Sequence, residues 1–146
     1  KPFTNVKRQY FRLRVENQGS TVARRLKAKV ELYFPNRSFA DRFEPSALRW
    51  IPGEEMIDLA PREEDYLNLL SQIIEQQGFR GNSLRVELSN MVNRGIAWDR
   101  TLDNSWILKV SVHGENLRAP VVRFFRFDPS KNKDAAGDLT QIETSL

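Results

Sequence analysis

The chain has 146 residues, a length that fits a single domain able to bury about 68–70% of its unfolded surface. Its hydrophobic content of 40% is enough to fill one core, and the absence of cysteine excludes disulfide bonds, thiolate metal sites and a cysteine nucleophile. The net charge of +4 is unevenly spread, because residues 1–50 carry 12 Lys and Arg against 4 Asp and Glu, whereas residues 51–79 carry 1 against 7.

Two alternating segments open the chain. In residues 11–15, Phe-Arg-Leu-Arg-Val, apolar and basic side chains alternate with the period of two that a half-buried strand requires. Residues 26–32 repeat this alternation, and Asn17 and Gly19 between them indicate a turn, since both residue types accept a positive φ readily. We predict two strands, which either pair directly or face each other across two sheets.

Further strands follow, and the chain ends in a polar segment. Alternation predicts strands at residues 48–50, 84–88, 106–112 and 121–127. Residues 131–146 are polar and are interrupted by Ala135-Ala136-Gly137. We therefore expect one domain over residues 1–130, followed by a loosely ordered C-terminal tail.

The segment 61–77 gives conflicting signals. Pro61 suits the first turn of a helix, and acidic residues follow it directly. The apolar residues recur at helical spacing, at Tyr66, Leu69, Leu70, Ile73 and Ile74. The same stretch also fits a strand, through Leu67, Leu69, Ser71 and Ile73. Local signals alone favour a helix.

The opening of the chain resembles a known class of β-domain. The run from Tyr10 to Ala23, with its Asn-x-Gly turn, leads into Leu26-x-Ala28-x-Val30-x-Leu32 and resembles immunoglobulin-like modules, most of all the bacterial and archaeal adhesion-related type called CARDB. Later pieces, Leu48-x-Trp50 and Trp106-x-Leu108-x-Val110, resemble related bacterial domains. The resemblance implies an all-β, immunoglobulin-like antiparallel β-sandwich of about seven or eight strands. It implies a strand within 61–77, with one short helix as the alternative, and no specific activity.

A set of basic residues is the candidate binding site. Those expected on the polar faces of the first two strands or beside them are Arg12, Arg14, Arg24, Arg25, Lys27 and Lys29. Such a face can bind an anionic surface, either acidic lipid headgroups or nucleic acid. Nucleic acid is disfavoured, because the phenylalanines mostly alternate into the core and leave few aromatic rings for base stacking. The alternative is that the acidic segment 51–79 folds against these strands and neutralises them.

No cofactor, metal or catalytic site is predicted. A single histidine, His113, excludes multi-histidine metal sites. The Asp128-x-Ser130-x-Asn132 sequence resembles the start of a calcium loop, but Lys133 stands where the loop glycine belongs. Two acidic patches, at 54–65 and 99–104, fit solvated loops better than a metal site.

The three tryptophans invite a carbohydrate-binding interpretation, because flat aromatic rings stack on sugars. Trp50 and Trp106 lie within strand patterns, so we expect them in the core. Trp98 lies in a loop-like stretch and is the candidate for an exposed ring.

We therefore expect a non-catalytic interaction or spacer module of a larger prokaryotic protein, one that can carry a membrane anchor elsewhere. Its partner would be a protein or another domain of the same chain. The alternatives are an anionic-surface binder and an enzyme with an unrecognised site. The start at Lys1-Pro2, without methionine, indicates a fragment or a processed product. No apolar run approaches the ~20 residues of a membrane span, and the compartment stays open, with a cytoplasmic or membrane-associated soluble domain slightly favoured.

Overall fold

The computed structural model describes residues 6–33, 46–51, 53–76, 83–88, 96–99, 105–128 and 137–143. Within these ranges the chain is all-β and contains no helix, so no helix there could span a membrane. The strands are β1 (Val6–Glu16), β2 (Ala23–Tyr33), β3 (Ser46–Trp50), β4 (Ile57–Leu59), β5 (Glu64–Gln76), β6 (Ser83–Leu88), β7 (Ile96–Asp99), β8 (Trp106–His113), β9 (Val121–Asp128) and β10 (Asp138–Ile142).

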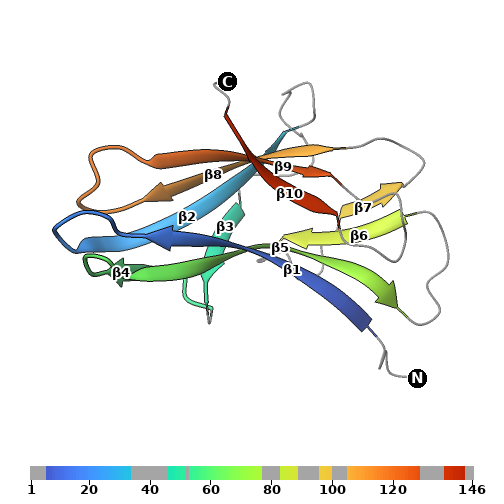
Figure 1. The fold of residues 1–146 in the computed structure, drawn as a ribbon, viewed down its shortest axis with the longest axis horizontal. Coiled ribbons are helices and arrows are strands. Elements are labelled where there is room, and N and C mark those ends of the chain that lie inside the picture. The colour runs from blue at the N-terminus through green and yellow to red at the C-terminus, as the bar shows by residue number, and fades with distance from the viewer. Residues whose placement is uncertain are drawn as a thin grey trace.

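Antiparallel pairing joins the strands into one sheet that curls into a nearly closed, barrel-like form (Figure 1). Strands follow one another in the order β10-β9-β8-β2-β3-β5-β6-β7, while β1 pairs with β5 and β4 pairs with β2. β3 joins the two halves of the sheet, because residues 46–48 pair with β2 and residues 49–50 pair with β5. The two opening strands therefore do not pair with each other, and β1 and β2 lie in different halves.

The predicted strands at 11–15, 26–32, 48–50, 84–88, 106–112 and 121–127 are confirmed within β1, β2, β3, β6, β8 and β9. β4, β7 and β10 are short and were not predicted. β7 contains Trp98, so the expectation that this residue lies in a loop is wrong. β10 lies within the segment that we expected to be a loosely ordered tail, and it pairs with β9 from Asp138↔Asp128 to Ile142↔Phe124.

The strand that the resemblance implies within 61–77 is confirmed as β5, which pairs with β1, β3 and β6, and the helix that local signals favour there is wrong. The register between β1 and β5 shifts twice, skipping Leu69 and then Ile74. At a β-bulge an extra residue is left unpaired and the strand bends. Each apolar doublet, Leu69-Leu70 and Ile73-Ile74, lies at such a shift, and Leu69 and Leu70 are both buried. The doublets that imitate helical spacing are therefore bulges in a strand.

The core lies inside the curl and draws on both halves of the sheet. Trp50 and Phe127 are its largest fully buried side chains, and Trp106 is buried as expected. The Trp50 indole Nε1 donates a hydrogen bond to the Leu26 carbonyl at 3.1 Å, so the only polar atom of that side chain has a partner. The Phe11 ring meets the Phe127 ring edge-on, with centroids 5.3 Å apart, and so links β1 to β9 across the core.

The turn after β1 is held by a side chain and not by left-handed backbone. Asn17 Nδ2 donates to the carbonyls of Thr21 at 2.8 Å and Leu59 at 2.9 Å, and Asn17 Oδ1 accepts from the Gly19 N–H at 2.9 Å. The expected positive φ is present at neither Asn17 nor Gly19. The Asn-x-Gly sequence works here through the amide group of Asn17, as Asn side chains commonly do in turns.

A turn at residues 60–63 precedes β5 and contains a strained position. The Glu63 N–H donates to the Ala60 carbonyl at 3.0 Å, Pro61 is the second residue, and Arg62 has a φ of 70°. A positive φ at the third position is typical of a type II turn, which favours glycine there. Left-handed backbone costs an ordinary residue about 1–2 kcal/mol.

Replacing Arg62 by glycine should therefore stabilise the fold by about 0.5–1 kcal/mol, the relieved strain less the entropy that glycine gains in the unfolded chain. Chemical denaturation monitored by circular dichroism measures the change. Arg62→Ala is the matched control, because it removes the same side chain and keeps the left-handed cost. A glycine variant no more stable than the alanine variant would contradict the assignment of strain to this position.

Candidate functional site

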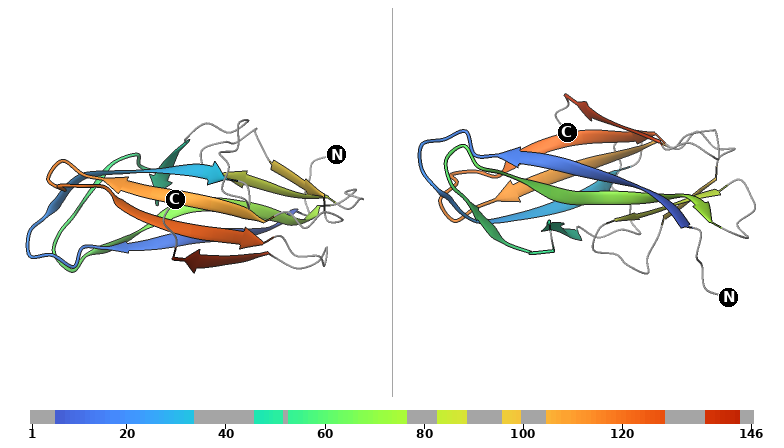
Figure 2. Two further views of the ribbon diagram at one scale, coloured as in Figure 1. Left: turned by 90° about the horizontal axis from the view of Figure 1, so that it is seen from above. Right: turned by 60° about the horizontal axis from the view of Figure 1, so that its bottom comes forward.

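One side of the curled sheet is open along β1 and β9. Among the described residues β5 is the only partner of β1, and β10 covers residues 124–128 of β9 but leaves residues 121–123 without a neighbour on that side. β1 and β9 run alongside each other there in both views of Figure 2. A cleft of about 600 Å³ lies between them, within the range of about 300–1,000 Å³ that is usual for ligand pockets. We call it the β1–β9 cleft.

The floor of the β1–β9 cleft is the hydrophobic core itself. Leu26, Leu67, Val110 and Val112 are buried core residues, and all four line the cleft. The walls are half-buried apolar side chains, namely Leu13 and Val15 of β1, Phe125 of β9 and Leu117 of the β8–β9 turn. The cleft therefore lies directly over the core.

The mouth of the cleft carries more positive than negative charge. Arg12 and Arg14 of β1 and Arg123 of β9 line it, and Glu16 is its one carboxylate. Arg12 has a neutral partner, because its Nε donates to Asn68 Oδ1 at 3.1 Å and its guanidinium lies 5.2 Å from the centre of the Tyr10 ring. An exposed guanidinium of this kind can still accept an anionic partner.

The Phe11–Phe127 contact lies next to the cleft in both strands. The cleft-lining residues of β1 begin at Arg12, directly after Phe11, and those of β9 extend from Val121 to Phe125, just before Phe127. The aromatic pair therefore joins β1 to β9 beside the cleft.

The structure divides the predicted basic site between the two halves of the sheet. Arg12 and Arg14 lie on β1, whereas Arg24, Arg25, Lys27 and Lys29 lie on β2. All except Lys29, which is half-buried, are exposed. Arg14 Nη1 lies 3.3 Å from Glu64 Oε2, and Arg25 Nε lies 3.7 Å from Glu115 Oε2. Glu64 belongs to the acidic segment 51–79, so one of the basic residues, Arg14, is neutralised by that segment as the alternative required. Binding of an anionic surface by the six residues stays a prediction.

The start of β2 is held by two side chains, one from β4 and one from the β8–β9 turn. The Arg25 N–H donates to Asp58 Oδ1 at 2.7 Å, and the Arg24 N–H donates to Asn116 Oδ1 at 2.9 Å. A shallow polar depression beside them is lined by Arg25, Glu54, Asp58 and Asp65, among others.

In the described part of the chain no group of three Asp, Glu or His side chains could hold a metal ion. Residues 100–104 and 129–136, which include other metal candidates, lie outside it.

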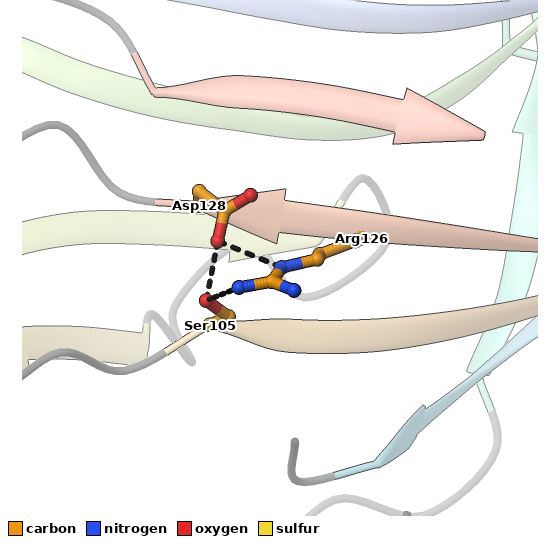
Figure 3. A network of polar contacts seen from close by, with 3 residues as sticks. All are labelled: Ser105, Arg126 and Asp128. Carbon is orange, nitrogen blue, oxygen red and sulfur yellow. Dashed lines mark hydrogen bonds and ion pairs between the residues drawn. The ribbon is translucent and has the colours of Figure 1, made fainter. Parts of the chain in front are cut away.

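A polar network that the sequence analysis missed ties the start of β8 to the end of β9 (Figure 3). The buried Ser105 hydroxyl donates to Asp128 Oδ1, and Arg126 donates to the same oxygen at 2.9 Å and to Ser105 Oγ at 3.1 Å. No histidine takes part in this network, and the Asp128 carboxylate is already paired with Arg126. We therefore interpret the three residues as a structural contact that holds β8 and β9 together. Only the pairing of β8 with β9 brings Ser105 near Asp128, and no local sequence motif marks it.

The remaining polar features lie on or near strand ends. His113 is exposed at the end of β8, opposite Lys27. Burial, together with a 3.0 Å hydrogen bond to Glu31 and the charge of that carboxylate, raises the pKa of Tyr33 above its ordinary value. Neither residue lines the β1–β9 cleft.

Comparison with known proteins gives no match: no protein-family model, curated protein or solved structure shows significant similarity to this chain.

Proposed function

We propose that this chain is a non-catalytic interaction module that takes an apolar group of its partner into the β1–β9 cleft. One observation carries the proposal, namely that buried core residues such as Leu67 and Val110 form the floor of an open cleft. Exposed apolar concavities of this kind mark binding sites for partners or ligands. A pure spacer would gain nothing from an apolar cleft in its surface.

The finer assignment of the fold, an immunoglobulin-like β-sandwich of the CARDB type, is part of this proposal. Two observations support this assignment: β1 and β9 face each other across the core, and the described strands all pair antiparallel. In such folds partners commonly bind at exposed edges and loops. We place the chain as one module of a larger prokaryotic protein, bound to another protein or to another domain.

The dye 1-anilinonaphthalene-8-sulfonate tests the cleft, because it combines an apolar ring system with a negative charge. The folded protein should bind one dye molecule with a blue shift in emission. Val121 lines the cleft and is 44% exposed, so a carboxylate there needs no burial in the core. Val121→Asp should weaken dye binding by about tenfold or more, since the carboxylate repels the sulfonate and must be desolvated by the ring. Fluorescence titration measures both affinities.

Val22→Asp is the matched control. Val22 is 38% exposed, carries the same change of charge and lies outside the cleft lining. This variant should bind the dye as the unmodified protein does, with near-ultraviolet circular dichroism showing that all three proteins are folded. If the folded protein binds no dye, or if both variants bind equally, the cleft is not a binding site.

A further inference from the structure

β1 offers a free backbone edge along the mouth of the cleft. On the side away from β5 the described part of the chain contains no strand paired with β1. Unpaired N–H and C=O groups on such an edge form a template for an added strand. A lipid chain could fill an apolar cleft, but it could not satisfy these backbone groups. The edge therefore favours a polypeptide as the occupant.

The side chains of β1 specify what the added strand must carry. Leu13 and Val15 line the cleft, and Arg12 and Arg14 alternate with them as exposed residues at its mouth. Side chains directly opposite each other on paired strands interact, favourably when their charges are opposite. A complementary strand would therefore alternate apolar residues, which enter the cleft, with acidic residues, which face the two arginines.

Charge also argues against a second copy of this chain as the occupant. Two β1 strands paired antiparallel about Leu13 would place Arg12 of one copy opposite Arg14 of the other. Like charges opposite each other destabilise a strand pair. Arg12, which has no carboxylate partner in the described part of the chain, and Arg123 across the cleft both add positive charge for an acidic strand to meet.

We propose that the β1–β9 cleft receives an extended segment of a partner protein in which apolar and acidic residues alternate, and that this segment adds to the free edge of β1 as a new strand. The inference rests on the proposed function, since it names the partner chemistry of the same cleft. The added strand supplies backbone hydrogen bonds to β1 and apolar side chains to the apolar lining of the cleft.

Synthetic peptides test this inference. A peptide of about eight residues that alternates isoleucine with glutamate matches the length of an ordinary strand. Calorimetric titration at low salt should show one binding site and an affinity about tenfold higher than for the same peptide with lysine in place of glutamate. A scrambled peptide of the same composition should not bind. Hydrogen exchange should show new protection of backbone amides within residues 10–15.

Charge-reversed variants give the matched control. Exchanging both Arg12 and Arg14 for glutamate should reverse the preference between the two peptides. Arg62→Glu with Arg118→Glu makes the same change of net charge at exposed positions outside the cleft and should leave the preference unchanged. Equal binding of the acidic and basic peptides, or protection away from β1, overturns the inference. If the dye binds and the peptide does not, the strand inference fails and the proposed function stands; if neither binds, both fail.

Discussion

Replacement of Trp50 by alanine is expected to lower the free energy of unfolding by about 3–5 kcal/mol, which is the usual cost of deleting a buried aromatic side chain. Trp50 is fully buried, and it belongs to β3, the strand that pairs with both halves of the sheet. Its loss leaves a cavity where the halves are joined, and it also removes the hydrogen bond donor of the Leu26 carbonyl. Urea denaturation followed by circular dichroism measures the loss.

Trp50→Phe separates the two contributions. It keeps most of the apolar volume and removes only the indole N–H, so we expect a smaller cost of about 1–3 kcal/mol for the unpaired carbonyl together with the lost volume. A loss below about 1 kcal/mol for the alanine variant would show that Trp50 does not join the two halves, since surface changes have effects of that size.

Phe127→Ala should have an effect of similar size, about 3–5 kcal/mol, because Phe127 is fully buried and its ring packs against Phe11. The edge-on contact with Phe11 can be measured by itself. A double-mutant cycle with Phe11→Ala should give a coupling energy of about 0.5–1.5 kcal/mol, as is usual for such aromatic pairs. Denaturation of the two single variants and the double variant provides the four free energies.

Phe127→Leu is the conservative comparison, since it keeps an apolar side chain in the core while removing the aromatic contact. A coupling energy near zero between Phe11 and Phe127 would mean that β1 and β9 are held together by other contacts.

Period-two alternation predicts much of this fold from the sequence. It marks β1, β2, β6 and β8 because one face of each is apolar and the other polar. It fails at β5, where skipped residues put the adjacent Leu69 and Leu70 in the core and produce the spacing of a helix. Pairing with β1 decides the outcome there, and no local signal in the sequence reports a partner nearly sixty residues away.

The candidate site could be predicted only in part. Alternation identified Arg12 and Arg14 as exposed and Leu13 and Val15 as inward-facing, and the structure keeps both assignments. It could not show that β1 pairs with β5 while β2 lies in the other half, because alternation reports the faces of a strand and not its neighbours. The cleft depends on strand order, since its lining comes from seven strands and the turns between them.

The partners of β1 also have a consequence for how the chain folds. β1 has no neighbour close in sequence, since its nearest paired residues are Glu16 and Glu64, whereas β8 and β9 follow each other directly. Pairings between distant segments form slowly, because the chain loses the entropy of closing a long loop before the new contacts stabilise it. During synthesis β1 emerges before β5 and cannot form this pairing until β5 has been made. The two walls of the cleft are therefore assembled at different times, and the cleft is complete only after this distant pairing has formed.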